Sequence, residues 1–161
     1  MNTLSSNRTE SRMNSTGPAF PSGCGLGRPP TNERSEPESI LLVEDDQMIR
    51  CLAQRILTQA GFEVLEADSA EQAIEVWGNH ADRIDLMLTD VCIPYRATGL
   101  ELARRFSAEK PDLKVVYTSG FSPEMAADDG MLRHNINFLA KPYNPAALVQ
   151  IVRDFLHPIA G

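Results

Sequence analysis

The chain has 161 residues, of which 42% are hydrophobic, and its formal net charge of −7 comes from 15 basic and 22 acidic side chains. This size suits one domain. No run approaches the roughly 18 to 20 apolar residues that span a bilayer, and the first residues lack the apolar core of a secretory signal. We therefore expect a cytoplasmic protein with no membrane partner.

The three cysteines, Cys24, Cys51 and Cys92, are odd in number and far apart, and no two of them form a C-x-x-C pair. Neither a disulfide framework nor a thiolate zinc site is indicated. Reduced thiols without a metal are expected.

Residues 1–37 differ in composition from the rest of the chain. Gly, Pro, Ser, Thr and Asn make up 23 of them, and their few apolar residues follow no helical or strand period. Such a segment cannot bury enough surface to offset chain entropy, so it is predicted to be a disordered tail, with a partner-binding arm or a misassigned start as alternatives. Residues 38–161 hold 11 basic and 19 acidic side chains, which disfavours nucleic-acid binding.

Short apolar runs alternate with amphipathic stretches from Ser39 onward. Within the stretch 47–60, apolar residues recur at helical spacing, and Gly61 follows at the position expected after a helix end. Ser69 and Gln72 form a capping box at the start of the next helix. The predicted elements are, in order, a strand at 40–43, a helix at 47–60, a strand at 63–67, a helix at about 70–80 and a strand at 84–89.

The second half of the chain continues this alternation, which gives five strand–helix units in all. Its predicted elements are a helix at 99–110 stopped by Pro111, a strand at 114–118, a short helix opened by Ser122-Pro123-Glu124, a strand at 137–140 and a helix opened by Asn144-Pro145. Five βα units in about 120 residues predict a parallel sheet with helices on both faces. In such sheets ligands bind at the carboxyl ends of the strands.

Chemically reactive side chains follow four of the five predicted strands. These are Glu44, Asp45 and Asp46 after the first strand, Asp90 at the end of the third, Ser119 at the end of the fourth and Lys141 at the end of the fifth. Crowded carboxylates repel one another unless a cation neutralises them, and hard oxygen ligands suit Mg²⁺ better than zinc or copper. One carboxylate could accept a phosphoryl group as a mixed anhydride, with Lys141 neutralising its charge and Ser119 donating a hydrogen bond.

Each of these residues also has a structural interpretation. An acidic run before a helix is usually favoured by the helix dipole, an isolated Asp can be a turn residue, and a single Lys is most often solvated. Their joint placement at the strand ends favours a site. His80, His134 and His157 lie at predicted helix ends or loops and are interpreted as surface residues.

Four ordered segments resemble the receiver domain of bacterial two-component response regulators over about residues 38–158. The segments are ILLVEDDQMIR (40–50), LMLTDVCIP (86–94), VVYTSG (115–120) and FLAKPYNP (138–145). The resemblance implies a doubly wound, flavodoxin-like (βα)5 fold whose five-stranded parallel sheet has strand order 2-1-3-4-5.

The resemblance also assigns roles to residues. It implies Asp90 as phosphoacceptor, Lys141 as phosphate partner preceding a cis-Pro142, and Ser119 and Phe138 as switch residues. It further implies Mg²⁺ (or Mn²⁺) held by Glu44, Asp45, Asp90 and the backbone carbonyl of Cys92. Two features depart from the family pattern: Glu44 stands where Asp is commoner, and the loop from Pro94 to Gly99 has one residue more than the commonest form.

These roles imply a single-domain response regulator that takes a phosphoryl group from a histidine kinase or phosphotransfer protein and switches a contact surface for a downstream protein. It would not be an enzyme beyond slow self-dephosphorylation, and no output domain is expected after it. The last strand and helix, about 138–156, are the expected contact or homodimer surface. The alternatives are a phosphorylation-independent binding module and an aspartyl-phosphate hydrolase, whose second acid would be needed where Cys92 stands.

Overall fold

Five parallel strands pair into one sheet in the computed structural model, which describes residues 36–93, 97–120 and 137–158. The strands are β1 (Ser39–Val43), β2 (Glu63–Ala67), β3 (Ile84–Asp90), β4 (Lys114–Ser119) and β5 (Phe138–Ala140). Their order across the sheet is β2-β1-β3-β4-β5. The predicted doubly wound α/β fold and its strand order are therefore confirmed.

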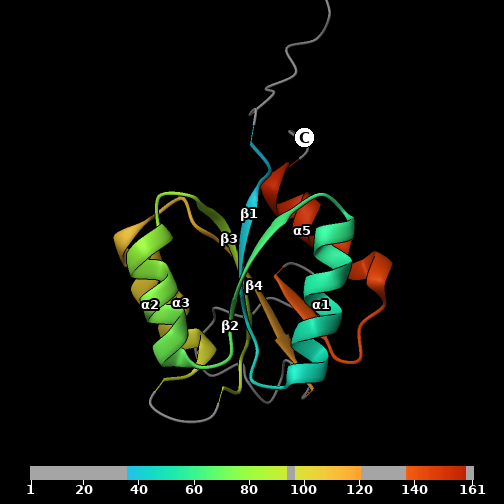
Figure 1. Cartoon of the computed structure of the whole chain (residues 1–161), viewed down its shortest axis with the longest axis horizontal. Coiled ribbons are helices and arrows are strands. Elements are labelled where there is room, and N and C mark those ends of the chain that lie inside the picture. Colours follow the sequence, from blue (N-terminus) through green and yellow to red (C-terminus); the bar gives the residue numbers. More distant parts are fainter. Residues whose placement is uncertain (1–35, 94–96, 121–136, 159–161) are drawn as a thin grey trace, which may run out of the picture. The chain divides into compact units, whose positions relative to one another are not determined.

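Four described helices cover the two faces of this sheet. They are α1 (Gln47–Gln59), α2 (Ala70–His80), α3 (Gly99–Glu109) and α5 (Pro145–Leu156). Helices α1 and α5 pack on one face, and α2 and α3 pack on the other (Figure 1). None of the described helices is long and apolar enough to cross a membrane.

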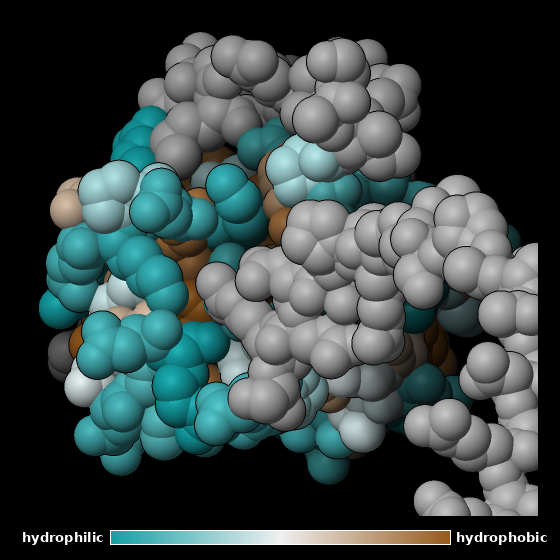
Figure 2. Space-filling model, turned by 90° about the horizontal axis from the view of Figure 1, so that it is seen from above, coloured by the Kyte–Doolittle hydropathy of each residue, from teal (hydrophilic) through white to brown (hydrophobic). Residues whose placement is uncertain are grey.

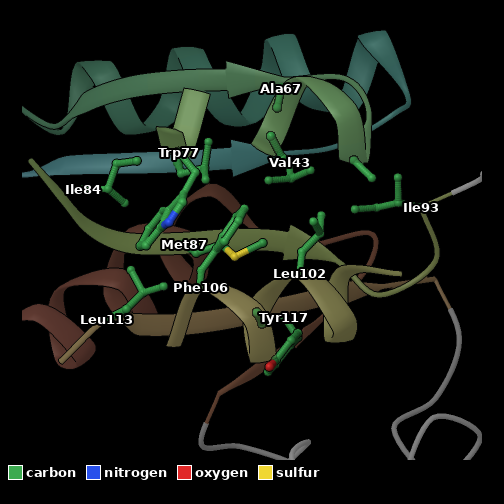
Figure 3. Packing of buried hydrophobic residues seen from close by; sticks show 14 of the residues in the cluster. Val43, Ala67, Trp77, Ile84, Met87, Ile93, Leu102, Phe106, Leu113 and Tyr117 are labelled. Carbon is green, nitrogen blue, oxygen red and sulfur yellow. The ribbon is translucent and has the colours of Figure 1, made fainter. Parts of the chain in front are cut away.

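The apolar strand residues alternate between these two faces, as the two-residue period of a strand requires. In β1, Leu41 and Val43 pack toward α2 and α3, whereas Ile40 and Leu42 pack toward α1 and α5. Between the sheet and α2 and α3, the rings of Trp77 and Phe106 stack with centroids 4.4 Å apart (Figure 3). Each such fully buried large side chain contributes about 1.5 to 3 kcal/mol to folding.

Every described helix begins at a polar capping residue. The side chains of Asp46, Ser69 and Asn144 accept backbone N–H groups of the first turns of α1, α2 and α5. Thr98 and Glu101 form a reciprocal capping box at α3. These caps satisfy N–H groups that have no partner within the helix, so they determine where each helix starts after the strand before it.

The predicted boundaries agree with the structure to within one residue at most ends. The predicted helix opened by Ser122-Pro123-Glu124 and nearly all of the predicted tail 1–37 lie outside the described residues. Gly61 follows α1 with a φ of 99°, a left-handed conformation that glycine adopts without steric cost.

One end of the sheet carries a polar cluster that we call the amino-edge network, formed by Ser39, Glu63, Arg83 and Asp85. Arg83 donates to both carboxylate oxygens of Glu63 at 2.7 and 2.6 Å. Ser39 donates its hydroxyl to Glu63 at 3.1 Å and its backbone N–H to Asp85 at 3.1 Å. In the view from above, hydrophilic residues make up most of the described surface, with smaller apolar areas among them and at its margins (Figure 2).

Candidate functional site

Three carboxylates meet at the opposite, carboxyl end of the sheet. Strands β1 and β3 are neighbours paired in parallel, with Val43 opposite Thr89, so Glu44 and Asp90 follow these two residues at the same edge. Oxygen atoms of Glu44, Asp45 and Asp90 all lie within 4.8 Å of one another. We call this group the acid cluster. The sequence-based expectation that these three side chains lie together agrees with this geometry.

Lys141 joins two members of the acid cluster. Its Nζ donates to Oε2 of Glu44 at 2.6 Å and to Oδ2 of Asp90 at 2.5 Å. The residue follows β5 directly, where its backbone N–H donates to the carbonyl of Ser119 at 2.8 Å. The peptide bond from Lys141 to Pro142 is cis, the isomer expected at this position. Lys141 therefore reaches the acid cluster from the end of β5, which lies two strands away from β3.

Burial shifts the ionisation of this pair. Glu44 is 2% exposed, and its loss of water raises the pKa of the carboxyl above 4.5, outweighing the lowering effect of Lys141. Burial acts to lower the pKa of Lys141, but hydrogen bonds and negative charges from Asp90 and Glu44 outweigh it and raise that pKa above 10.5. The ammonium form of Lys141 is thus favoured, and it pairs with two of the three carboxylates of the acid cluster.

Asp90 is held by the backbone as well as by the lysine. The N–H of Cys92 donates to Oδ1 of Asp90 at 2.9 Å, so each carboxylate oxygen has a different donor. Cys92 is exposed and stands two residues after β3. Its backbone lies at the site, as the expected use of its carbonyl requires, whereas its Sγ is not part of the acid cluster.

The two predicted switch residues lie in β4 and β5, the two strands that follow β3 across the sheet. Ser119 ends β4, is 1% exposed and is paired in register with Ala140 of β5. Phe138 begins β5 opposite Tyr117 and is 5% exposed within the core that contacts α2 and α3. Both side chains are therefore buried.

The acidic run after β1 divides into two roles. Asp46 accepts the N–H groups of Met48 and Ile49 at 2.8 and 3.0 Å and caps α1. Glu44 and Asp45 remain in the acid cluster, which does not include Asp46. The helix-dipole interpretation of the run therefore applies to Asp46, and the site interpretation applies to the two residues before it.

Gly99 lies beside the site, and sequence reasoning did not reveal why this position must be glycine. A Cβ at this position would stand 2.0 Å from the carbonyl oxygen of Asp90 and 2.6 Å from Oγ1 of Thr89. Only glycine lets the start of α3 approach the end of β3 this closely. The T-x-x-E signature at Thr98 and Glu101 could have located the cap of this helix.

Tyr143 is a second residue that sequence reasoning missed. Burial, with smaller contributions from the negative charges of Glu44 and Asp90, raises the pKa of its hydroxyl to about 12. The phenol is therefore neutral at physiological pH and belongs to the electrostatic surroundings of the acid cluster. Its place two residues after Lys141 gave no signal beyond proximity to the site in sequence.

The donor set fits a small divalent cation. Opposite ligands of one Mg²⁺ are separated by about 4 Å, close to the spread of the cluster oxygens, and Mg²⁺ usually keeps several waters beside one or two carboxylates. Three carboxylates facing one ammonium leave an excess of negative charge that a cation would neutralise. Thiolate and imidazole ligands, which softer metals prefer, are absent from this described cluster.

The chain combines a doubly wound α/β sheet with an anionic, lysine-bridged site at the carboxyl edge of that sheet. The model of the response regulator receiver domain family matches residues 40–153, and the chain belongs to this family of two-component signalling domains.

Individual relatives agree with this membership. The response regulator receiver protein CpdR of Brucella abortus (strain 2308) is 32% identical over 117 residues, which span 73% of this chain and 95% of that protein. Sensor kinase CckA of the same organism is 30% identical over 118 residues, but the match spans only 12% of that kinase. The crystal structure of a response regulator receiver protein from Sinorhizobium medicae WSM419 is similar with a TM-score of 0.68 and 30% identity, covering 77% of this chain and 98% of that one.

Proposed function

We propose that the chain accepts a phosphoryl group on Asp90 and thereby switches a protein-binding surface, acting as a phosphoacceptor and not as an enzyme. The observation that carries this proposal is the Lys141 ammonium, which contacts Glu44 and Asp90 at 2.6 and 2.5 Å at the carboxyl edge of the sheet. A fixed cation beside a carboxylate at a strand end is what a transferred phosphoryl group requires.

In the proposed reaction a carboxylate oxygen of Asp90 attacks the phosphorus of a phosphohistidine. The new P–O bond forms while the P–N bond breaks, and the electron pair of that bond returns to the donor's imidazole nitrogen. The product is a mixed anhydride that carries more negative charge than the carboxylate did. Lys141 would then pair with phosphoryl oxygens, and the Ser119 hydroxyl would donate a hydrogen bond to one of them.

The acid cluster supplies the cation site in this proposal. Glu44, Asp45, Asp90 and the backbone carbonyl of Cys92 would hold Mg²⁺ or Mn²⁺, which neutralises phosphoryl oxygens when bound. Lys141 pairs with Glu44 and Asp90, so the chain itself balances part of the negative charge of the acid cluster.

The switch would pass from β4 to β5. Ser119 is paired in register with Ala140, and Phe138 begins the same three-residue strand, so a pull on Ser119 reaches Phe138 through adjacent backbone. Strand β5 forms one edge of the sheet. We propose β5 and α5, residues 138–156, as the surface for a downstream protein or a second copy of the chain.

The proposed phosphodonor is a histidine kinase or a phosphotransfer protein, and nucleic acid is not a proposed partner. Support comes from the relatives, since one is a sensor kinase and another a receiver protein that the match spans almost entirely. We also propose that the receiver domain spans residues 38–158 and works in the cytoplasm.

The test is phosphorylation of the full chain by acetyl phosphate with Mg²⁺, followed by intact-mass spectrometry. Wild type should gain one acid-labile phosphoryl group, the gain should disappear with EDTA, and Asp90→Asn should not be labelled. Asp68→Asn is the matched control, because Asp68 is an exposed acid just after β2 that lies outside the acid cluster. No labelling of wild type, or equal labelling of Asp90→Asn, would contradict the proposal and favour a phosphorylation-independent binding module.

The remaining alternative is a hydrolase that uses an aspartyl phosphate. Such an enzyme needs an acid two residues after the nucleophile to activate the leaving group, and this position holds Cys92. Steady turnover of a generic phosphomonoester by wild type, lost in Asp90→Asn, would support that alternative against ours.

A further inference from the structure

Arg50 connects the loop that carries two acid-cluster residues to a neighbouring strand. Its Nη1 donates to the carbonyl oxygen of Glu44 at 2.7 Å and to that of Asp45 at 3.4 Å. Its Nε lies 3.7 Å from Oε2 of Glu66 in β2. The Arg50 side chain is 16% exposed and the Glu66 side chain 40% exposed, so the guanidinium is largely buried while its ion-pair partner is half-exposed.

The loop between β1 and α1 needs such support because it must hold like charges close together. Glu44 and Asp45 are adjacent acids that both face Asp90 within the cluster. The backbone N–H of Glu44 donates to the carbonyl of Ala67 at 3.0 Å, which fixes one side of the peptide chain. Arg50 fixes the opposite, carbonyl side, and it does so from within α1, a rigid element.

We propose that Arg50 is a positioning residue for the cation site: its guanidinium holds the backbone of Glu44 and Asp45 so that their carboxylates converge on Asp90. This inference rests on the proposed function and deepens it. Arg50 hydrogen-bonds the backbone carbonyls of these residues and does not occupy their carboxylates. Glu66 orients the guanidinium from β2.

If Arg50 is replaced, its positioning role and its charge predict opposite changes in the affinity for Mg²⁺. A guanidinium beside a cation site repels the cation, so charge alone predicts tighter Mg²⁺ binding in Arg50→Ala. Positioning predicts weaker binding, because the two carboxylates lose their fixed geometry. Loss of a residue that orients metal ligands typically lowers metal affinity 10- to 100-fold.

The experiment is isothermal titration of Mg²⁺ into the full chain, at a temperature where far-UV circular dichroism shows each variant folded. Arg50→Ala should bind Mg²⁺ at least about tenfold more weakly than wild type. Arg55→Ala is the matched control, because it removes the same charge from an exposed position of the same helix, and its affinity should equal that of wild type. Glu66→Gln should give a smaller loss than Arg50→Ala.

The variant Arg50→Lys separates geometry from charge and serves if Arg50→Ala does not fold. It keeps the positive charge, but one ammonium cannot serve both carbonyls and Glu66, so we expect binding several-fold weaker than in wild type. If Arg50→Ala binds Mg²⁺ as tightly as wild type or more tightly, the inference is overturned. If Arg50→Ala does not fold, wild-type affinity in Arg50→Lys overturns it. Either result leaves the proposed function standing. A wild-type chain that binds no Mg²⁺ would overturn the proposed function and the inference with it.

Discussion

The two ends of the same sheet handle their charges in opposite ways. In the amino-edge network the carboxylate of Glu63 is matched by Nη2 of Arg83 and the hydroxyl of Ser39. In the acid cluster, Lys141 pairs with Glu44 and Asp90, so one ammonium stands against three carboxylates. The pKa shifts differ accordingly: Arg83 holds the pKa of Glu63 below 4.5, whereas burial raises that of Glu44 above it. The carboxylate of Glu63 has its own partner and is expected to support the fold, whereas the excess negative charge of the acid cluster is what the proposed cation would neutralise.

The largest effect is expected when the lysine that pairs with the acid cluster is removed. Lys141→Ala leaves Glu44 and Asp90 without their shared partner while both are largely buried, which should destabilise the metal-free chain by about 3 kcal/mol. Urea unfolding in EDTA measures this. Saturating Mg²⁺ should restore part of the loss.

Arg83→Ala makes the same kind of change at the other end of the sheet. The Arg83–Glu63 pair is half exposed and screened by water. Arg83→Ala should therefore lower the free energy of unfolding much less than Lys141→Ala, and by an amount independent of Mg²⁺. Equal losses for the two variants would remove the distinction between the two ends.

The next effect tests the close packing that places Asp90. Gly99→Ala puts a methyl group 2.0 Å from the carbonyl oxygen of Asp90, which should cost about 1 to 3 kcal/mol and lower the labelling of Asp90 by acetyl phosphate. Gly78→Ala is the control, because nothing lies within 4 Å of its new Cβ in α2, and it should stabilise the chain by about 0.5 to 1 kcal/mol. Similar melting temperatures for both variants would refute the packing argument.

A smaller effect is expected on the surface beside the acid cluster. Met48 and Leu52 are the large apolar side chains exposed in the described part of the chain, at 84% and 50%, and both lie in α1, which begins directly after the site. If a protein phosphodonor docks there, replacing both by Ala should slow transfer from the kinase severalfold while labelling by acetyl phosphate stays unchanged. Transfer from the kinase to this variant at the wild-type rate would place the docking surface elsewhere.

The smallest effect concerns pH at the amino-edge network. Hydrogen bonds from Arg83 lower the pKa of Glu63 in the folded chain, so the stabilisation by Glu63 is present above pH 4.5 and is lost as pH falls through the lowered value. Glu63→Gln should therefore narrow the gap in urea midpoint between pH 6 and pH 3.5. An unchanged gap would show that Glu63 contributes nothing to acid sensitivity.

The strand-end rule predicted much of the site because it depends only on topology. Apolar runs located the strands, and parallel order then required Glu44, Asp90 and Lys141 to meet although they are far apart in sequence. The same periodicity placed helices α1, α2, α3 and α5 to within one residue at most ends. These features follow from local patterns of hydrophobicity.

Other features depend on the direction of individual side chains, which no local pattern encodes. Asp45 and Asp46 are adjacent and chemically alike, yet one joins the acid cluster and the other caps α1. Arg50 looks like any exposed helix residue in the sequence, and its contact with Glu66 requires β2 to lie beside β1. Gly99 gives a helix start, but its close contact with Asp90 exists only once α3 is packed on the sheet.

The most direct test of the central claim identifies the residue that carries the phosphoryl group. Borohydride reduction of the phosphorylated chain converts an aspartyl phosphate to homoserine, which peptide mass spectrometry can assign to a position. We predict homoserine at position 90 alone, dependent on Mg²⁺. Conversion at Asp45, or no conversion at Asp90 in a labelled chain, would contradict the assignment of the acid cluster as a phosphoacceptor site built around Asp90.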